Sequence, residues 1–231
     1  MARIPYLDDS DLTADQRAVL EARRDVFGRN SAFQRIVTRT PKVARWFLPF
    51  VFSLQRGGAG GLLDGRTKEL AVLKTSMLNA CAFCTAHNRS LGSAVGLTDA
   101  EIDALAGDYE ASAVLSERDK AVVHWAEVVT RNEARRDAAG FERLKAHFTD
   151  DEIVELTWVS ALFNMINRIT DSLWLDIEEA DVEGIRKPVT EEGILEFVRR
   201  MLAHAEASAG GITSGDTTPG PARDAALADV G

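Results

Sequence analysis

The chain has 231 residues, 45% of them hydrophobic, which is an ordinary composition for one or two globular domains. Its 27 lysines and arginines are outnumbered by 36 aspartates and glutamates, so the formal net charge is -9. This acidic balance argues against nucleic acid or an anionic membrane surface as a partner, because both attract a basic face. No stretch approaches the roughly 20 apolar residues that span a bilayer, and the first residues lack the apolar core of a signal peptide, so we expect a cytoplasmic protein.

Helix signals recur along the chain without a convincing strand, and they predict an all-α fold. Capping boxes, in which Ser or Thr precedes an acid or Gln by three residues, occur at Thr13, Thr98, Thr149 and, in a weaker form, Ser116. Thr40 stands before Pro41, which is typical of a helix start, and Gly96 fits a helix stop. The expected helices are 14–28, 41–56, 65–79, 81–95, 99–107, 117–132, 138–147, 150–176 and 190–207.

The only two cysteines, Cys81 and Cys84, have the spacing of a CxxC pair, and His87 follows three residues later. In a helix, a spacing of three places these side chains along one face. Two thiols that can close into a disulfide, with an imidazole beside one of them, form a minimal redox site. The other interpretations are two small buried hydrophobic residues, or a zinc site that lacks the four ligands structural zinc requires.

Cys81 is expected near the start of its helix, after Asn79 and Ala80 interrupt the preceding one. A thiol in the first turn of a helix feels the positive end of the macrodipole, which favours the thiolate. This argument alone favours Cys81 as the thiol of lower pKa. Phe83 is expected to turn toward the core and help to keep water away from the pair.

The later helix 150–176 is apolar on most sides but carries a polar line formed by Asn164, Asn167, Arg168 and Asp171. Buried polar groups must be paired. The line is therefore either an internal network between Arg168 and Asp171, or a wall of the active site or a subunit contact.

Three features together resemble the alkylhydroperoxidase AhpD-like / carboxymuconolactone decarboxylase superfamily: Glu69, the motif Cys81-x-x-Cys84-x-x-His87, and the segment Gly96-Leu97-Thr98-Asp99-Ala100-Glu101-Ile102. The segment Asn167-Arg168-Ile169-Thr170-Asp171 is similar to that family's distal helix. The resemblance implies an AhpD-like helical bundle with a CxxC at a helix N-terminus. It also implies assembly into homo-oligomers, either trimers or hexamers.

The resemblance covers about residues 40–176, the expected AhpD-like core domain. Residues 1–39 are then an N-terminal helical extension and residues 177–207 a C-terminal one. Residues 208–231 are rich in Ser, Gly, Thr, Pro, Asp and Ala. They have too few large apolar side chains to offset chain entropy, so we expect a disordered tail.

The resemblance also implies roles for the site residues. Cys84 matches the cysteine that attacks peroxide, Cys81 the resolving cysteine, His87 the base, and Glu69 a carboxylate that joins the proton relay. The best-studied members have the histidine four residues after the second cysteine, whereas here the spacing is three. They also carry a histidine between the cysteines, where this chain has Phe83.

The first functional hypothesis is therefore a thiol-dependent peroxidase with an antioxidant role. Its attacking thiol becomes a sulfenic acid, which condenses with the second thiol to a disulfide. No bound cofactor and no metal are expected, and electrons would come from an external dithiol such as a lipoyl protein or a low-molecular-weight thiol. The alternatives are a general thiol-disulfide oxidoreductase or redox sensor, and a non-redox enzyme of the decarboxylase branch, which generally lacks the dithiol.

Overall fold

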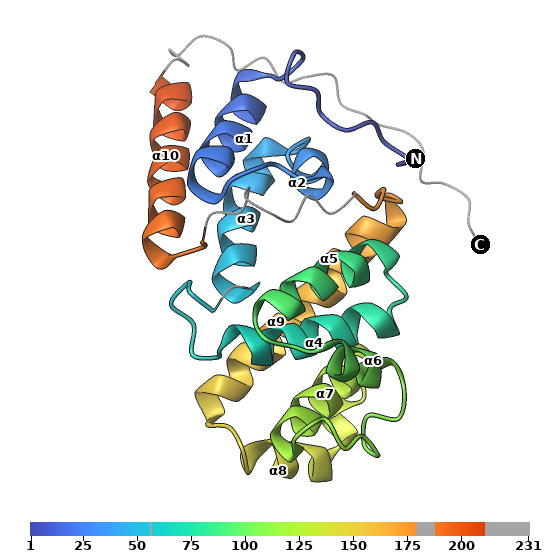
Figure 1. The fold of residues 1–231 in the computed structure, drawn as a ribbon. Coiled ribbons are helices and arrows are strands. Elements are labelled where there is room, and N and C mark those ends of the chain that lie inside the picture. Colours follow the sequence, from blue (N-terminus) through green and yellow to red (C-terminus); the bar gives the residue numbers. More distant parts are fainter. Residues whose placement is uncertain (56, 179–187, 211–231) are drawn as a thin grey trace, which may run out of the picture.

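The computed structural model describes residues 1–55, 57–178 and 188–210, and these residues form an all-α fold without a strand among them, as predicted (Figure 1). The helices are α1 (Ala14–Phe27), α2 (Ala32–Val37), α3 (Pro41–Gln55), α4 (Gly65–Leu78), α5 (Ala82–Ala94), α6 (Asp99–Ala106), α7 (Glu117–Thr130), α8 (Ala138–Lys145), α9 (Asp150–Ser172) and α10 (Glu191–Gly210). A short 3-10 helix, η1 (Ala134–Arg136), lies between α7 and α8. None of the described helices combines the length and the apolar character that crossing a membrane requires.

Each expected helix is present, and all four capping boxes are formed. The helices that were not expected, α2 and η1, are too short to show a clear apolar period. Helix α10 extends to Gly210, so the beginning of the expected tail 208–231 is helical. Residues 211–231, like 179–187 of the expected C-terminal extension, lie outside the described residues.

Helix α9 ends at Ser172, four residues before the predicted boundary at 176. Trp174 adopts a left-handed conformation with φ 52°, the backbone N–H of Leu175 donates to the Thr170 carbonyl, and the Trp174 N–H donates to the Asp171 carbonyl. This is a Schellman motif, in which the left-handed position usually holds glycine. The helix end was mispredicted because a tryptophan occupies that position.

Helix α4 is the centre of the lower bundle in Figure 1, where it packs against α5, α7 and α9. Every residue from Thr67 to Ser76 is buried, including the ionisable side chains of Lys68, Glu69 and Lys74. A helix that is buried on all sides belongs to the core of its domain. Chemistry placed at either end of α4 is therefore held by a rigid support.

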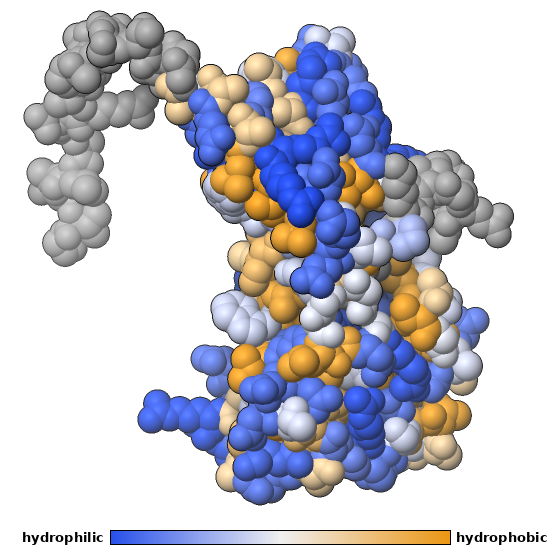
Figure 2. Space-filling model, turned by 90° about the vertical axis from the view of Figure 1, so that its left-hand side faces the viewer, coloured by the Kyte–Doolittle hydropathy of each residue, from blue (hydrophilic) through white to orange (hydrophobic). Residues whose placement is uncertain are grey.

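A second, smaller core lies among α1, α3 and α10 in the upper part of Figure 1. Phe27 of α1 and Phe52 of α3 lie with their ring centroids 4.3 Å apart, and Phe197 of α10 packs 6.0 Å from Phe27. Helix α3 also contacts α4 and α9, so it joins the two cores. The molecule narrows between them, and hydrophobic side chains reach the surface near this narrowing (Figure 2).

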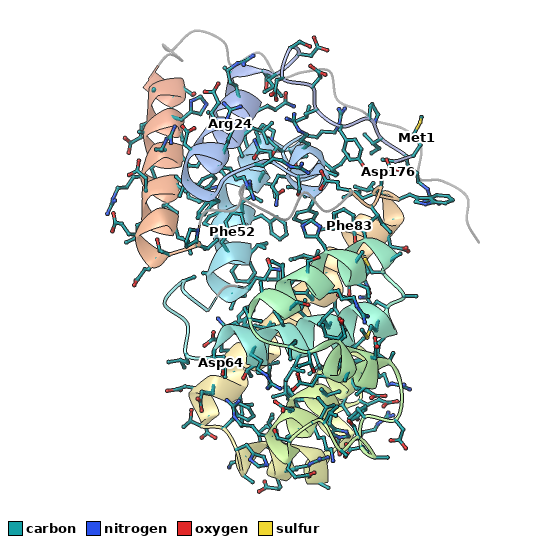
Figure 3. The ribbon with its side chains drawn as sticks, in the orientation of Figure 1. Met1, Arg24, Phe52, Asp64, Phe83 and Asp176 are labelled. Atoms are coloured by element: carbon teal, nitrogen blue, oxygen red, sulfur yellow. The ribbon has the colours of Figure 1, made fainter. Side chains whose placement is uncertain are left out.

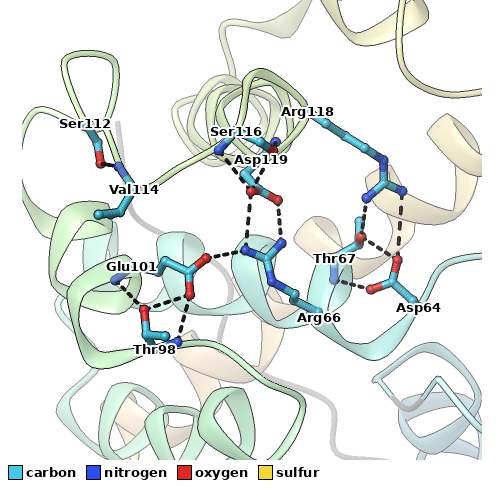
Figure 4. A network of polar contacts seen from close by, with 10 residues as sticks. All are labelled: Asp64, Arg66, Thr67, Thr98, Glu101, Ser112, Val114, Ser116, Arg118 and Asp119. Atoms are coloured by element: carbon cyan, nitrogen blue, oxygen red, sulfur yellow. Dashed lines mark hydrogen bonds and ion pairs between the residues drawn. The ribbon is translucent and has the colours of Figure 1, made fainter.

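Ion pairs fasten the amino-terminal end of α4 to its neighbours (Figure 4). The Arg66 guanidinium lies 2.6 Å from an Asp119 oxygen on α7 and 2.5 Å from a Glu101 oxygen on α6. One residue along α7, Arg118 donates to the Thr67 hydroxyl at 2.9 Å. These contacts fix the direction of α4 and, through it, the position of its other end.

The amino-terminal segment closes over the end of α9. Figure 3 shows Met1 beside Asp176, and the Ala2 backbone N–H donates to the Asp176 carboxylate at 3.1 Å. The Tyr6 hydroxyl also contacts this carboxylate, and the Arg3 N–H donates to the Leu173 carbonyl. Residues 1–6 therefore hold the same end of α9 that approaches the cysteines.

Candidate functional site

The turn between α4 and α5 positions the first cysteine. Ala80 adopts a left-handed conformation with φ 52°, and its N–H donates to the Met77 carbonyl while the Cys81 N–H donates to the Ser76 carbonyl. This Schellman motif ends α4 and delivers Cys81 directly as the N-cap of α5. The short turn thus fixes the thiol at the start of a helix, close to where the sequence predicted it.

The two sulfurs lie in one buried cluster, and both cysteines are free thiols with a residue exposure of 2%. The Cys84 backbone N–H donates to Cys81 Sγ at 3.2 Å, so the sulfur performs the capping role usually taken by an oxygen. The Thr170 hydroxyl of α9 lies 3.1 Å from Cys81 Sγ and 3.2 Å from Cys84 Sγ. One hydroxyl therefore contacts both sulfurs.

These contacts separate the two thiols electrostatically. The hydrogen bond from the Cys84 thiol lowers the pKa of Cys81 to about 6 against the effect of burial, and hydrogen bonds from Thr170 and from the Cys84 N–H act in the same direction. The pKa of Cys84 is raised, because this thiol gives its hydrogen bond to Cys81 and is itself buried. The hydrogen bonds around the pair therefore favour the thiolate of Cys81 over that of Cys84.

His87 lies on α5, one turn after Cys84, and is half-buried. Its ring stacks on Phe83 with centroids 5.4 Å apart and an interplanar angle of 13°. Phe83 is 8% exposed and belongs to the main core, where α5 approaches the upper helices (Figure 3). The aromatic stack gives the imidazole a defined orientation on the cysteine helix.

Glu69 lies in the middle of α4 and is 1% exposed. Without the family resemblance, a solvated helix residue would be the ordinary interpretation for a glutamate, and this interpretation is wrong here. The structure thus brings Cys81 and Cys84 together, carries His87 on the same helix, and buries Glu69 on the helix packed against it.

Asn88 is a site residue that the sequence did not reveal. It stands four residues after Cys84, where the resemblance led us to expect a histidine. Its amide donates to the Cys84 carbonyl at 2.8 Å and accepts from the Gln55 amide of α3 at 3.1 Å. The position therefore serves to join α5 to α3, and the imidazole stands one residue earlier.

A network of neutral side chains extends from the cysteines along α9. The Asn79 amide donates to the side-chain oxygens of Asn164 and Asn167, both at 3.0 Å, and Asn167 donates to the Ser76 hydroxyl at 3.2 Å. Asn167 also hydrogen-bonds to Cys84 and favours its ionised form. The polar line predicted on α9 therefore includes a wall of the thiol site.

The other members of that line behave differently. Arg168 is exposed and donates to the carbonyl and side-chain oxygens of Asn164. The residue whose role was missed is Thr170, three positions after Asn167 on the same helix. Its spacing from Asn167 was a usable signal, but an uncharged threonine in an apolar helix is ordinarily a packing residue.

Comparison with known proteins agrees with the resemblance expected from the sequence. Residues 41–128, from α3 to α7, match the model of the carboxymuconolactone decarboxylase family. No curated protein sequence matches the chain. A protein of unknown function from Agrobacterium tumefaciens, described in connection with antioxidant defence and AhpD, is 27% identical with a TM-score of 0.57, over 62% of this chain and 96% of its own.

Two further solved structures share the fold at lower identity. An uncharacterized peroxidase-related protein with an alkylhydroperoxidase AhpD core, from Ralstonia eutropha JMP134, is 22% identical with a TM-score of 0.66, over 77% of this chain and 93% of its own. The debrominase Bmp8, as its C82A variant in complex with 2,3,4-tribromopyrrole, is 16% identical with a TM-score of 0.63, over 84% of this chain and 95% of its own. The helical arrangement around the cysteines is therefore a shared scaffold.

Proposed function

Because residues 41–128 match the carboxymuconolactone decarboxylase family and carry a buried pair of free thiols, we propose that this protein is a thiol-dependent peroxidase with an antioxidant role. The observation that carries the proposal is the geometry of the pair: both thiols are buried and free, and Cys81 Sγ accepts the Cys84 backbone N–H at the start of α5. A peroxidase of this kind needs one thiolate to attack and one thiol to resolve. The CxxC turn supplies both within one helical turn.

The geometry favours Cys81 as the attacking sulfur, which reverses the roles that the resemblance implied. The Cys81 thiolate attacks one oxygen of the hydroperoxide, the O–O bond breaks, and the sulfur becomes a sulfenic acid while an alkoxide leaves. The Cys84 thiol then attacks this sulfur, which forms the Cys81–Cys84 disulfide and releases water. An external dithiol, of lipoyl or low-molecular-weight type, returns the pair to the reduced state and is itself oxidised.

The leaving alkoxide needs a proton, and we assign its supply to His87 with Glu69. His87 lies one helical turn from Cys84 and is oriented by Phe83, and Glu69 is a buried carboxylate on the adjoining helix. An imidazole titrates near neutral pH, so it can both accept a proton from a thiol and return one to the product. No bound cofactor enters these steps.

The proposed cellular form is a cytoplasmic homo-oligomer, a trimer or a hexamer. The apolar side chains that are exposed on α3 and α9 support self-association, since Trp46 and Trp158 are each about half exposed, at 47% and 53%. Large exposed aromatic side chains are typical of protein interfaces. Size-exclusion chromatography with light scattering measures the assembly directly.

The decisive experiment is a peroxide challenge of the reduced protein, followed by thiol counting and intact mass with a sulfenic-acid trap. The expected result is loss of both thiols as a Cys81–Cys84 disulfide, which a dithiol reverses. In the Cys84→Ser variant, trapped sulfenic acid is expected on Cys81. Two thiols that survive peroxide unchanged would contradict the proposal.

The same dithiol can also support thiol–disulfide exchange without peroxide, as in a general oxidoreductase or a redox sensor. That function predicts rapid exchange with disulfide substrates and negligible peroxide consumption. A brominated pyrrole belongs in the same substrate panel, since the Bmp8 scaffold binds one. Whichever oxidant converts the dithiol to the disulfide fastest identifies the reaction.

A further inference from the structure

Among the described residues, Thr170 is the only one whose side chain lies within hydrogen-bond distance of both cysteine sulfurs through an oxygen or nitrogen atom. It is 1% exposed and lies near the end of α9, where the amino-terminal segment holds the helix. Its hydroxyl oxygen is also 3.0 Å from the Ile166 carbonyl and 3.0 Å from the Asn167 carbonyl. Four groups therefore compete for one hydroxyl.

A hydroxyl has one proton to donate and two lone pairs with which to accept. The carbonyls of Ile166 and Asn167 can only accept, whereas each cysteine sulfur can donate when protonated and must accept when ionised. With both thiols protonated, the hydroxyl proton points to a carbonyl and the thiols donate to the oxygen. When one sulfur loses its proton, it becomes the strongest acceptor of the four.

We propose that Thr170 is a further residue of the reaction centre, whose single hydroxyl proton turns from a helix carbonyl to whichever cysteine sulfur carries the negative charge. The inference deepens the proposed function. Only the step in which the thiolate attacks peroxide rests on that function; the effect of Thr170 on thiol ionisation does not. In the reduced protein the recipient is Cys81, which also accepts from the Cys84 backbone N–H. When a dithiol reduces the disulfide and one sulfur leaves as thiolate, the same hydroxyl is within reach of either.

When the Thr170 hydroxyl turns toward a sulfur, no backbone carbonyl is left without a hydrogen bond. The carbonyls of Ile166 and Asn167 lie within α9, so each also accepts a backbone N–H from four residues later in the helix. Losing the second donor from threonine therefore leaves an ordinary helical carbonyl. A buried Cys81 thiolate that lost the Thr170 donor would instead keep its charge with one hydrogen bond fewer, beside the one from the Cys84 N–H.

The charged groups around the pair lie on all three helices packed there. Asp171 on α9 opposes ionisation of Cys81 through its negative charge. Glu69 on α4 and His87 on α5 are the other titratable side chains of the proposed site. Each of these groups stays in place when only the Thr170 hydroxyl is removed, so the hydroxyl can be tested separately.

The test measures the pH midpoint of thiolate formation by ultraviolet absorbance, as the difference between reduced and oxidised protein. Thr170→Val keeps the branched shape and removes the hydroxyl, Thr170→Ala removes it with less crowding, and Thr170→Ser restores it. Thr157→Val is the matched control. Thr157 lies on the same helix and donates to the Ile153 carbonyl at 2.7 Å in the same way, but it contacts Trp125 instead of a sulfur.

Loss of a hydrogen bond to a charged group predicts that the midpoint rises by about one pH unit in Thr170→Val and Thr170→Ala. Near the wild-type midpoint this lowers the thiolate fraction several-fold. Thr170→Ser and Thr157→Val are expected to keep the wild-type midpoint. Circular dichroism shows which variants are folded. If Thr170→Val is not folded, Thr170→Ala still provides the test.

A wild-type midpoint in both hydroxyl-free variants would overturn the inference. So would an equal rise in Thr157→Val, or a Thr170→Ser protein that behaves like Thr170→Val. Because the readout is ionisation, it does not depend on turnover. A protein that ignores peroxide yet shows the midpoint shift contradicts the proposed function and leaves the role of Thr170 intact.

Discussion

Ionisable side chains have different partners along the buried part of α4. The lysines on the helix itself form ion pairs, whereas the thiols that follow its end have neutral hydrogen-bonding partners. Near its start, Lys68 lies 2.6 Å from the Glu155 carboxylate. Further along the helix, Lys74 lies 3.2 Å from the Glu127 carboxylate. Toward its end, the side chains that hydrogen-bond to the thiols from α9 are a neutral amide and a neutral hydroxyl, those of Asn167 and Thr170. Buried ion pairs hold the helices in place. Neutral groups that can reorient their hydrogen bonds instead allow a neighbouring thiol to ionise and to be protonated again.

The difference explains how one helix can both support the fold and border the proposed reactive site. An ion pair with both partners buried is costly to break, because removing one partner leaves an uncompensated charge. A thiol can ionise, be oxidised and return without such a penalty, provided donors and acceptors adapt. We propose that the thiol end of α4 has that property because the Thr170 hydroxyl can donate to a sulfur or accept from it.

The largest effect is expected at the thiol end of α4, when one of the two sulfurs is removed. In Cys81→Ser and Cys84→Ser the disulfide cannot form, so we expect peroxide turnover to fall to the background rate, which is a loss of about four orders of magnitude or more if the pair acts as one unit. Both variants are expected to stay folded, since serine is nearly isosteric. Coupled peroxide consumption with a dithiol reductant measures the loss.

Cys84→Ser is also expected to give a single stoichiometric reaction, because its Cys81 can still form the sulfenic acid. Cys81→Ser is expected to react slowly even once. If instead Cys81→Ser shows the stoichiometric burst, the attacking residue is Cys84, as the resemblance implied.

At the supporting end, Lys68→Met is expected to destabilise the protein by about 3–5 kcal/mol. Glu155 would be left buried without its partner, although it also accepts the Leu62 and Leu63 backbone N–H groups. Denaturant unfolding followed by circular dichroism measures the change. The midpoint of Cys81 ionisation is expected to stay the same, since the two ends are separate.

The control is Arg143→Met, which removes an exposed ion pair with Glu110. Surface pairs contribute about 0–1 kcal/mol, so this variant should change little. A Lys68→Met protein that is as stable as Arg143→Met would mean that the buried pair does not have a supporting role.

The next largest effect is expected from the proposed proton relay of His87 and Glu69. His87→Ala is expected to lower kcat/KM for peroxide by about a hundredfold and to change its pH profile, since a positioned acid or base contributes that much. Glu69→Gln is expected to have a smaller effect in the same direction. The pH dependence of kcat/KM measures both.

The double variant distinguishes a relay from two independent contributions. If His87 and Glu69 act in series, removing both should cost little more than removing His87 alone. Wild-type kinetics for Glu69→Gln would exclude Glu69 from the relay and leave His87 to act alone.

Much of the fold could be predicted from the sequence because its helix starts are marked by local chemistry. Thr13, Thr98 and Thr149 each begin a helix through a capping box, and Pro41 begins another. Helix ends were less certain where the left-handed residue is not glycine. Trp174 ends α9 and Ala80 ends α4 in conformations that sequence patterns assign to glycine.

The site was predictable in part for the same reason. Cys81, Cys84 and His87 are neighbours in sequence, so their proximity follows from helix spacing alone. Thr170 reaches the thiols from 86 residues away, and only the packing of α9 on α5 brings it there. Apart from its spacing of three from Asn167, no local pattern distinguishes this threonine from the others on the helix, which include Thr157.

The smallest expected effect is a pH dependence of stability that reports the charge on Cys81. Its pKa is lowered to about 6 in the folded protein, against roughly 8.5 in an unfolded chain. Between these values the unfolded state binds more protons, so the free energy of unfolding should rise with pH across this interval. This contribution is complete above about pH 8.5 and is lost as the pH falls through about 6.

Above pH 8.5 or so the raised pKa of Cys84 has the opposite effect, because the unfolded chain releases a proton that the folded protein retains. Stability should therefore pass through a maximum on the alkaline side of neutral. Urea unfolding of the reduced protein at a series of pH values measures the curve, and Cys81→Ser, which keeps the four histidines, subtracts their share. Parallel curves for wild type and Cys81→Ser would mean that the folded protein does not hold the negative charge on Cys81.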